Sequence, residues 1–278
     1  MLGSLRSQGK PLLPSTMLGW SIKLFKIRGI QLAVHFSFVL WLGWWALQGY
    51  QEAGPAGAFW SAAELLAFFT CVVLHELGHC FTGMRFGMRV QRILLMPIGG
   101  MAQFDAIPRQ PRQEILMTLA GPAVNFVIAL VLFLALGAQA PDLADGGAVP
   151  LSLLDLLRQL MVWNLIMGCF NLLPAFPMDG GRILRATLAY FTTYLQATRW
   201  AATTGKVVSG ILVAVSLYFG WYVTAFLFGF IFMAGEGEYR MILRQEQAEA
   251  RWKQMMAQVY APPPPPGAEP EPPLLHRP

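Results

Sequence analysis

The segment LLAFFTCVVLHELGHCF, residues 65–81, joins a run of apolar side chains to two imidazoles and a carboxylate. His75 and His79 are four residues apart, so on an α-helix they lie one above the other and can bind the same metal ion. Glu76, next to the first imidazole, can then act on water at the metal instead of binding the metal. The chain has only four His, so this spacing is a fairly specific signal of a metal site.

The composition around this segment is that of a membrane protein. The chain has 278 residues, of which 55% are hydrophobic and 13% charged, whereas a soluble domain needs more polar surface. Apolar runs predict spans at residues 30–47, 58–81, 115–138 and 151–173, and a last region, 200–233, that suits two helices hinged near Gly220. We therefore expect an all-α polytopic membrane protein with about six transmembrane helices.

Two segments depart from the helical pattern. Residues 88–104 are too few to cross the membrane as a helix, are rich in Val, Ile and Leu, and are interrupted by Pro97, Gly99 and Gly100. They predict a small membrane-associated β-hairpin or sheet between the second and third helices, with a simple connecting loop as the alternative. Residues 20–34 alternate near their end and favour an interfacial strand or amphipathic segment.

Basic residues predict the orientation in the membrane. They gather before the first span and between the second and third spans, whereas the two loops expected on the other side have none. These residues are Arg6, Lys10, Lys23, Lys26 and Arg28, then Arg85, Arg89, Arg92, Arg109 and Arg112. By the positive-inside rule the N-terminus and the histidine motif lie on the cytoplasmic side of a cell membrane. These cytoplasmic segments account for most of the net charge of +5, so the lipid bilayer is the expected partner and no nucleic-acid partner is expected.

Four regions are expected along the chain. Residues 1–19 read as a disordered leader, and residues 20–234 as the membrane core that contains the motif. Residues 235–260 mix acidic and basic side chains and predict a cytoplasmic helix. Residues 261–278 are rich in Pro and predict a disordered tail.

A catalytic zinc usually takes three protein ligands, so the motif needs one more. Asp179 fits best, because the stretch NLLPAFPMDGG, residues 171–181, stops a helix with its prolines and allows backbone turns at its paired glycines. Topology brings this stretch to the same side of the membrane as the motif. Asp105 and His35 are alternatives, whereas Glu114 suits a cap at the start of the third span. One Zn²⁺ per chain is the expected cofactor.

With these motifs in view, the chain resembles the site-2 protease family of intramembrane zinc metalloproteases, of the peptidase M50 type. The resemblance rests on the motifs HELGH at 75–79 and GPAVN at 121–125 and on the stretch 171–181. The similarity covers about residues 20–233. The chain is similar to the compact branch of the family, which has neither a PDZ domain nor a CBS module. The resemblance implies a zinc metalloendopeptidase that cleaves membrane-protein substrates in or near their transmembrane segments, in regulated intramembrane proteolysis.

The resemblance also assigns roles to single residues. It implies that His75, His79 and Asp179 bind zinc and that Glu76 is the catalytic acid/base. It suggests further that Asn171 and Asn125 are the substrate or oxyanion residues, in that Asn171 holds the substrate backbone or the developing oxyanion and Asn125 supports the core. Interhelical hydrogen bonding explains either Asn nearly as well.

A different class of protein can also use a buried His pair. In a polytopic metal-ion transporter or channel the two imidazoles would lie on an ion path. Glu76 discriminates between the two functions, because transport needs coordination but no general base.

Overall fold

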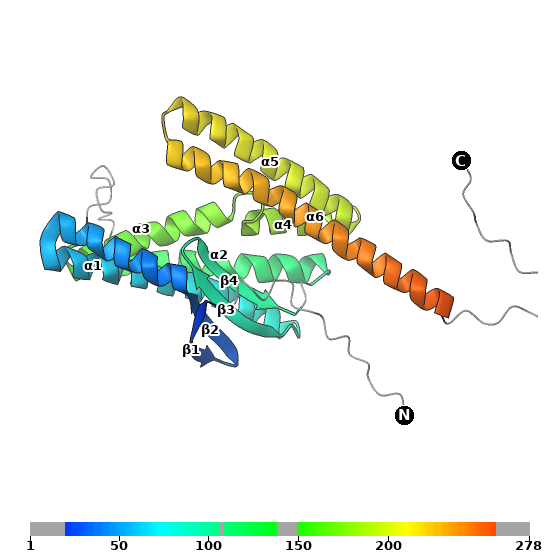
Figure 1. The fold of residues 1–278 in the computed structure, drawn as a ribbon, viewed down its shortest axis with the longest axis horizontal. Helices are drawn as coiled ribbons and strands as arrows, with labels where there is room; N and C mark the ends of the chain where they lie inside the picture. Colours follow the sequence, from blue (N-terminus) through cyan, green and yellow to red (C-terminus); the bar gives the residue numbers. More distant parts are fainter. Residues whose placement is uncertain (1–19, 106–107, 138–148, 260–278) are drawn as a thin grey trace, which may run out of the picture.

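The computed structural model describes residues 20–105, 108–137 and 149–259 (Figure 1). Within these ranges the protein is mostly helical and has one small sheet, which confirms the expected fold class. The elements are β1 (Ser21–Ile27), β2 (Ile30–His35), α1 (Phe36–Arg85), β3 (Val90–Met96), β4 (Gly99–Phe104), α2 (Pro111–Leu136), α3 (Leu153–Asn171), α4 (Asp179–Leu188), α5 (Tyr194–Tyr218) and α6 (Tyr222–Val259). The predicted leader, 1–19, and the predicted tail, 261–278, lie outside the described residues.

Helix α1 folds back on itself and supplies the first two predicted spans. Its backbone leaves helical geometry at Ala53 and Gly54, directly before Pro55, because Pro removes a helical hydrogen bond and Gly tolerates the positive φ of 64° found here. The two arms run side by side, and the rings of Phe38 and Phe69 lie 4.6 Å apart across them. The motif HELGH lies near the end of the second arm.

The first predicted span begins too early. Residues 30–35 form strand β2, and α1 starts only at Phe36. The side chain of His35 accepts a hydrogen bond from the backbone N–H of Ser37 and caps this helix. The alternation noticed before the first span is therefore that of a strand with one buried face.

The sheet is larger than predicted. Its order is β1-β2-β3-β4, with antiparallel pairs β1/β2 and β3/β4 and a parallel pair β2/β3. A parallel pair needs a long crossover, and α1 provides it. The prediction of strands between the second and third helices was right for β3 and β4, and residues 20–34, predicted as a strand or an amphipathic segment, form β1 and most of β2. The prediction missed that β2 pairs with β3, because pairing across a whole helix leaves no local signal. The buried side chains of β2 and β3 pack on both arms of α1.

Among the described residues, four helices are long and apolar enough to cross a membrane, namely α1, α2, α3 and α5. The turn between α5 and α6 contains Gly220 with a φ of 75°, which confirms the predicted hinge. α6 is one helix from Tyr222 to Val259, so the boundary predicted at residue 235 falls inside it. Its apolar part ends near Met233, and for this reason α6 is not among the four.

Helix α2 is central in the packing. It contacts α1 and α3, and also the short helix α4. α5 and α6 pack against each other, and α5 contacts α4 (Figure 1). Helix α4 is therefore the element that joins the α5–α6 pair to α2.

The fold-back of α1 predicts a stability effect. A Cβ at Gly57 would lie 2.1 Å from the carbonyl oxygen of Gly49, so Gly57→Ala should destabilise the protein by roughly 1–3 kcal/mol through overpacking. Thermal unfolding of the detergent-solubilised protein measures this. Gly43→Ala is the matched control, because nothing lies within 4 Å of its Cβ position. Equal melting temperatures for the two variants would contradict the close contact.

Candidate metal centre

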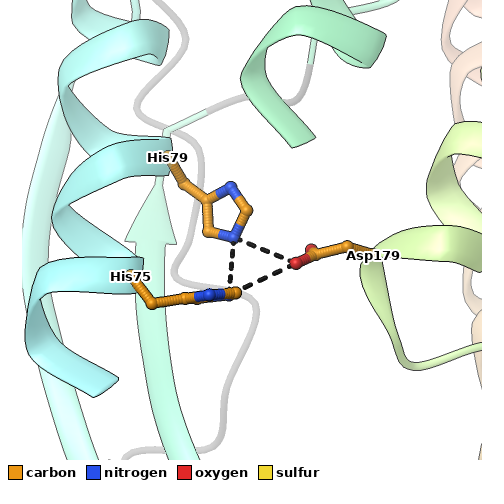
Figure 2. A group of neighbouring side chains, drawn as sticks. All are labelled: His75, His79 and Asp179. Carbon is orange, nitrogen blue, oxygen red and sulfur yellow. Dashed lines mark hydrogen bonds and ion pairs between the residues drawn. The ribbon is translucent and has the colours of Figure 1, made fainter. Parts of the chain in front are cut away.

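His75, His79 and Asp179 meet at one point, although Asp179 is a hundred residues further along the chain (Figure 2). The two Nε2 atoms lie 3.1 Å apart, and Asp179 Oδ2 lies 3.2 Å from that of His75 and 3.3 Å from that of His79. All three side chains are buried. The histidines come from α1 and the carboxylate from the first residue of α4.

Both imidazoles are oriented by α2. His79 donates from Nδ1 to the backbone carbonyl of Met117 at 2.8 Å, because a carbonyl oxygen can only accept. His75 Nδ1 lies 2.6 Å from Asn125 Oδ1. Each ring thus turns its Nε2 toward Asp179.

The proton on His75 Nδ1 follows from a chain of amides. Asn164 of α3 donates from Nδ2 to the carbonyl oxygen of Leu160, which leaves its Oδ1 as an acceptor. Asn125 donates from Nδ2 to that Oδ1 at 2.8 Å, so the oxygen of Asn125 faces His75. His75 must then donate from Nδ1 and keep a lone pair on Nε2.

Three lone pairs therefore converge within 3.3 Å. Neutral imidazoles and a carboxylate in this arrangement repel unless a cation is shared among them, and Asp179 Oδ2 has no hydrogen-bond partner among the described residues. Ligand atoms at about 2.1 Å from a tetrahedral zinc lie roughly 3.4 Å from one another, which is close to the observed separations. The donor set, two imidazoles and one carboxylate, fits Zn²⁺.

Asp179 supplies the anionic ligand of the set, because an ionised carboxylate only accepts hydrogen bonds and keeps its lone pairs for a metal ion.

Two glycines allow α1 and α2 to approach closely at the cluster. A Cβ on Gly78 would lie 2.6 Å from the carbonyl oxygen of Ala120. A Cβ on Gly121 would lie 2.3 Å from His79 Nε2 and 2.8 Å from His75 Nε2. The rings occupy the space that a side chain at position 121 would fill.

Glu76 lies beside the sheet. Gly100 at the start of β4 is so close that a Cβ there would lie 2.7 Å from Glu76 Cγ and 3.1 Å from Oε1. Glu76 is half-buried and directly follows the ligand His75 in the chain. The carboxylate thus lies next to the cluster and at one edge of the sheet.

The remaining predicted residues lie in different surroundings. Asn171 ends α3 and donates from Nδ2 to the carbonyl oxygen of Met167. His35 caps α1, and Asp105 accepts a hydrogen bond from Gln91, so neither alternative ligand belongs to the cluster. Glu114 lies in the first turn of α2, where it was expected, but it is buried and binds Arg185.

Asn164 and the partner of Glu114 were not predicted as functional. A polar or charged side chain in an otherwise apolar helix was the available signal for both Asn164 and Glu114. The identity of their partners was not visible in the sequence, because those partners are 39 and 71 residues away.

The model of peptidase family M50 matches residues 63–142 and 139–215. The chain belongs to peptidase family M50. A zinc metalloprotease of Methanocaldococcus jannaschii is 38% identical over 225 residues, which are 81% of this chain and 62% of that protein. The stage IV sporulation protein FB of Bacillus subtilis is 28% identical over 121 residues, which are 43% of this chain and 38% of that protein.

A solved structure also matches this M50 chain. The site-2 protease from M. jannaschii has a TM-score of 0.57 and 36% sequence identity, and the match covers 79% of this chain and 95% of that one. The chain spans about six-tenths of the length of the curated M. jannaschii relative.

The crowding at Gly121 predicts an effect on metal binding. Gly121→Ala should displace both imidazoles and lower zinc affinity, because its Cβ would overlap the ring of His79. Zinc affinity is measured on the purified protein by competition with a chelator. Gly210→Ala in α5, where nothing lies within 4 Å of the Cβ position, should bind zinc as the wild type does. Unchanged affinity in Gly121→Ala would contradict the arrangement.

Proposed function

We propose that this protein is an intramembrane zinc metalloprotease that hydrolyses peptide bonds in or near the transmembrane segments of membrane proteins. One observation carries the proposal: three metal-ligand atoms converge within 3.3 Å at the buried end of an apolar helix, beside a carboxylate that is not one of them. Membership of family M50 and the names of the relatives agree with this activity.

In the proposed site, His75, His79 and Asp179 hold the zinc ion. When bound, zinc supplies a Lewis acid that polarises the scissile carbonyl and lowers the pKa of water toward neutrality. Glu76 takes the proton from the attacking water and returns it to the leaving amine. Its position next to the first ligand, and outside the ligand cluster, supports this role.

The two asparagines receive separate roles. Asn125 orients His75 through the hydrogen bond to Nδ1, which supports a part in the site other than substrate contact. Asn171, at the end of α3, is the candidate for holding the substrate backbone or the oxyanion.

Strand β4 is the proposed contact for an extended substrate. It pairs with β3 alone among the described strands, so its outer edge has free backbone groups. Gly100, in this strand, contacts Glu76. A substrate strand added to this edge would pass close to the general base, and adding it requires a transmembrane substrate to unwind locally.

The proposed orientation places the N-terminus and the zinc site on the cytoplasmic side of the cell membrane, with the chain crossing several times. The basic residues before α1 and between α1 and α2 support this. Water would then reach the site from the cytoplasm.

Glu76→Gln tests the general base. The variant should retain zinc, because Glu76 is not in the ligand cluster, and should lose cleavage of a co-expressed membrane substrate by at least about 100-fold. Immunoblotting of the substrate and metal analysis of the purified protein give the two readings. Persistent cleavage would show that Glu76 is not the general base and would sink the proposed mechanism.

Asp179→Ala tests the third ligand. Loss of one of three ligands should lower bound zinc well below one per chain, as measured by metal analysis of the purified protein. The exposed carboxylate Glu249 provides a control, since Glu249→Gln should keep the wild-type zinc content. Unchanged stoichiometry in Asp179→Ala would exclude it as a ligand.

A further inference from the structure

A buried ionic cluster lies at the far end of the helix that begins with Asp179. Arg185 of α4 is fully buried and binds Glu114 of α2 through both Nε (2.9 Å) and Nη2 (2.5 Å). Its Nη1 donates to Glu238 of α6 at 3.2 Å. We call Glu114, Arg185 and Glu238 the ionic clasp; it joins α2, α4 and α6.

Aromatic rings hold the guanidinium from both neighbouring segments. Arg185 lies 5.3 Å from the ring centre of Phe176, in the turn before α4, and 5.0 Å from that of Tyr194, at the start of α5. Burial lowers the pKa of Arg185, but Glu114, Tyr194 and Glu238 together raise it more, so the guanidinium stays charged. Arg185 thus contacts side chains of α2, α5 and α6 and of the turn before α4.

Stability is a weak reason for such a cluster. Removing two charges from water costs about as much as their attraction returns, and apolar side chains of similar size often replace a buried ion pair without loss of stability. What the pair adds is direction, because Nε and Nη2 of one rigid guanidinium both donate to the same oxygen, Oε1 of Glu114, and so restrict the relative position of the two helices.

The face of α2 that carries Glu114 also carries the groups that contact the two histidines. Met117, whose carbonyl oxygen holds His79, is one turn further along. Gly121, which contacts both rings, and Asn125, which holds His75, follow at helical spacing on the same buried face. One stripe of α2 therefore contacts both imidazoles and, through Arg185, the helix that carries Asp179.

We propose that Arg185, held by Glu114, is a positioning residue that places Asp179 opposite the two imidazoles, so that α2 sets the geometry of all three metal ligands. This rests on the ligand set of the proposed function. It predicts that loosening the clasp weakens metal binding even where the protein stays folded. Glu238 completes the clasp from α6 and is partly exposed.

The experiment uses the full-length purified protein and two kinds of variant. Arg185→Lys keeps the charge but lacks the two-pronged contact with Glu114. The triple variant Glu114→Leu, Arg185→Met, Glu238→Gln replaces the pair by apolar side chains and leaves no buried charge behind. Zinc affinity is measured by chelator competition, and the ligand geometry by the visible absorption of the Co²⁺-substituted protein. Thermal unfolding without metal measures stability separately.

Both variants should bind zinc roughly 10- to 100-fold more weakly, as is typical when a residue that orients a ligand is lost. Their Co²⁺ spectra should differ from that of the wild type, and the metal-free triple variant should unfold near the wild-type temperature. A merely structural clasp would lower the unfolding temperature and leave affinity and spectrum unchanged, which overturns the proposal. If the triple variant does not fold, Arg185→Lys decides by the same two readings.

Two controls distinguish a failure of the positioning role of Arg185 from a failure of the proposed ligand set. Glu249 lies in α6, as Glu238 does, and Glu249→Gln breaks its exposed pair with Arg109 before α2. This variant should change neither affinity nor spectrum, because such pairs contribute little. Asp179→Ala should lose zinc. Unchanged zinc binding in Asp179→Ala would remove the ligand and the positioning role together, whereas loss there with wild-type binding in both clasp variants would overturn the positioning role alone.

Discussion

The metal cluster is split between two helices that the chain does not join directly, and its geometry depends on their contacts with α2. His75 and His79 come from α1 and Asp179 from α4, yet their ligand atoms lie within 3.3 Å of one another. α2 packs on both helices. It reaches α1 closely because Gly78 and Gly121 leave room, and it holds both rings through Met117 and Asn125.

The polar groups of the site also show how a membrane protein can bury them. In an apolar medium each unpaired donor or acceptor is costly, so polar side chains must find partners within the protein. Asn125 donates to Asn164, and Asn164 donates to the carbonyl oxygen of Leu160. Two carboxylates pair with the charge of Arg185. The resulting chain of partners orients the imidazoles as well as satisfying the groups.

Local patterns predicted much of this protein. The spacing of His75 and His79, the hinge at Gly220 and the strands of residues 88–104 are each visible within a few residues. Asp179 was chosen over other carboxylates from topology and from the prolines and glycines around it, and the structure brings it to the histidines. The errors have a common cause. The parallel pairing of β2 with β3 and the partner of Glu114 depend on contacts far apart in sequence.

The sequence by itself determined the membrane class, the imidazole pair on one helical face and the carboxylate after a broken helix. Hydrophobic length, helical period and turn chemistry are local properties, so they can be read without a fold. The tertiary structure alone decided which way each imidazole points, which side chains hold it, and that Arg185 ties the helix of Asp179 to α2. These depend on distances between helices of a few ångströms, which arise only when the side chains of α1, α2 and α4 pack together.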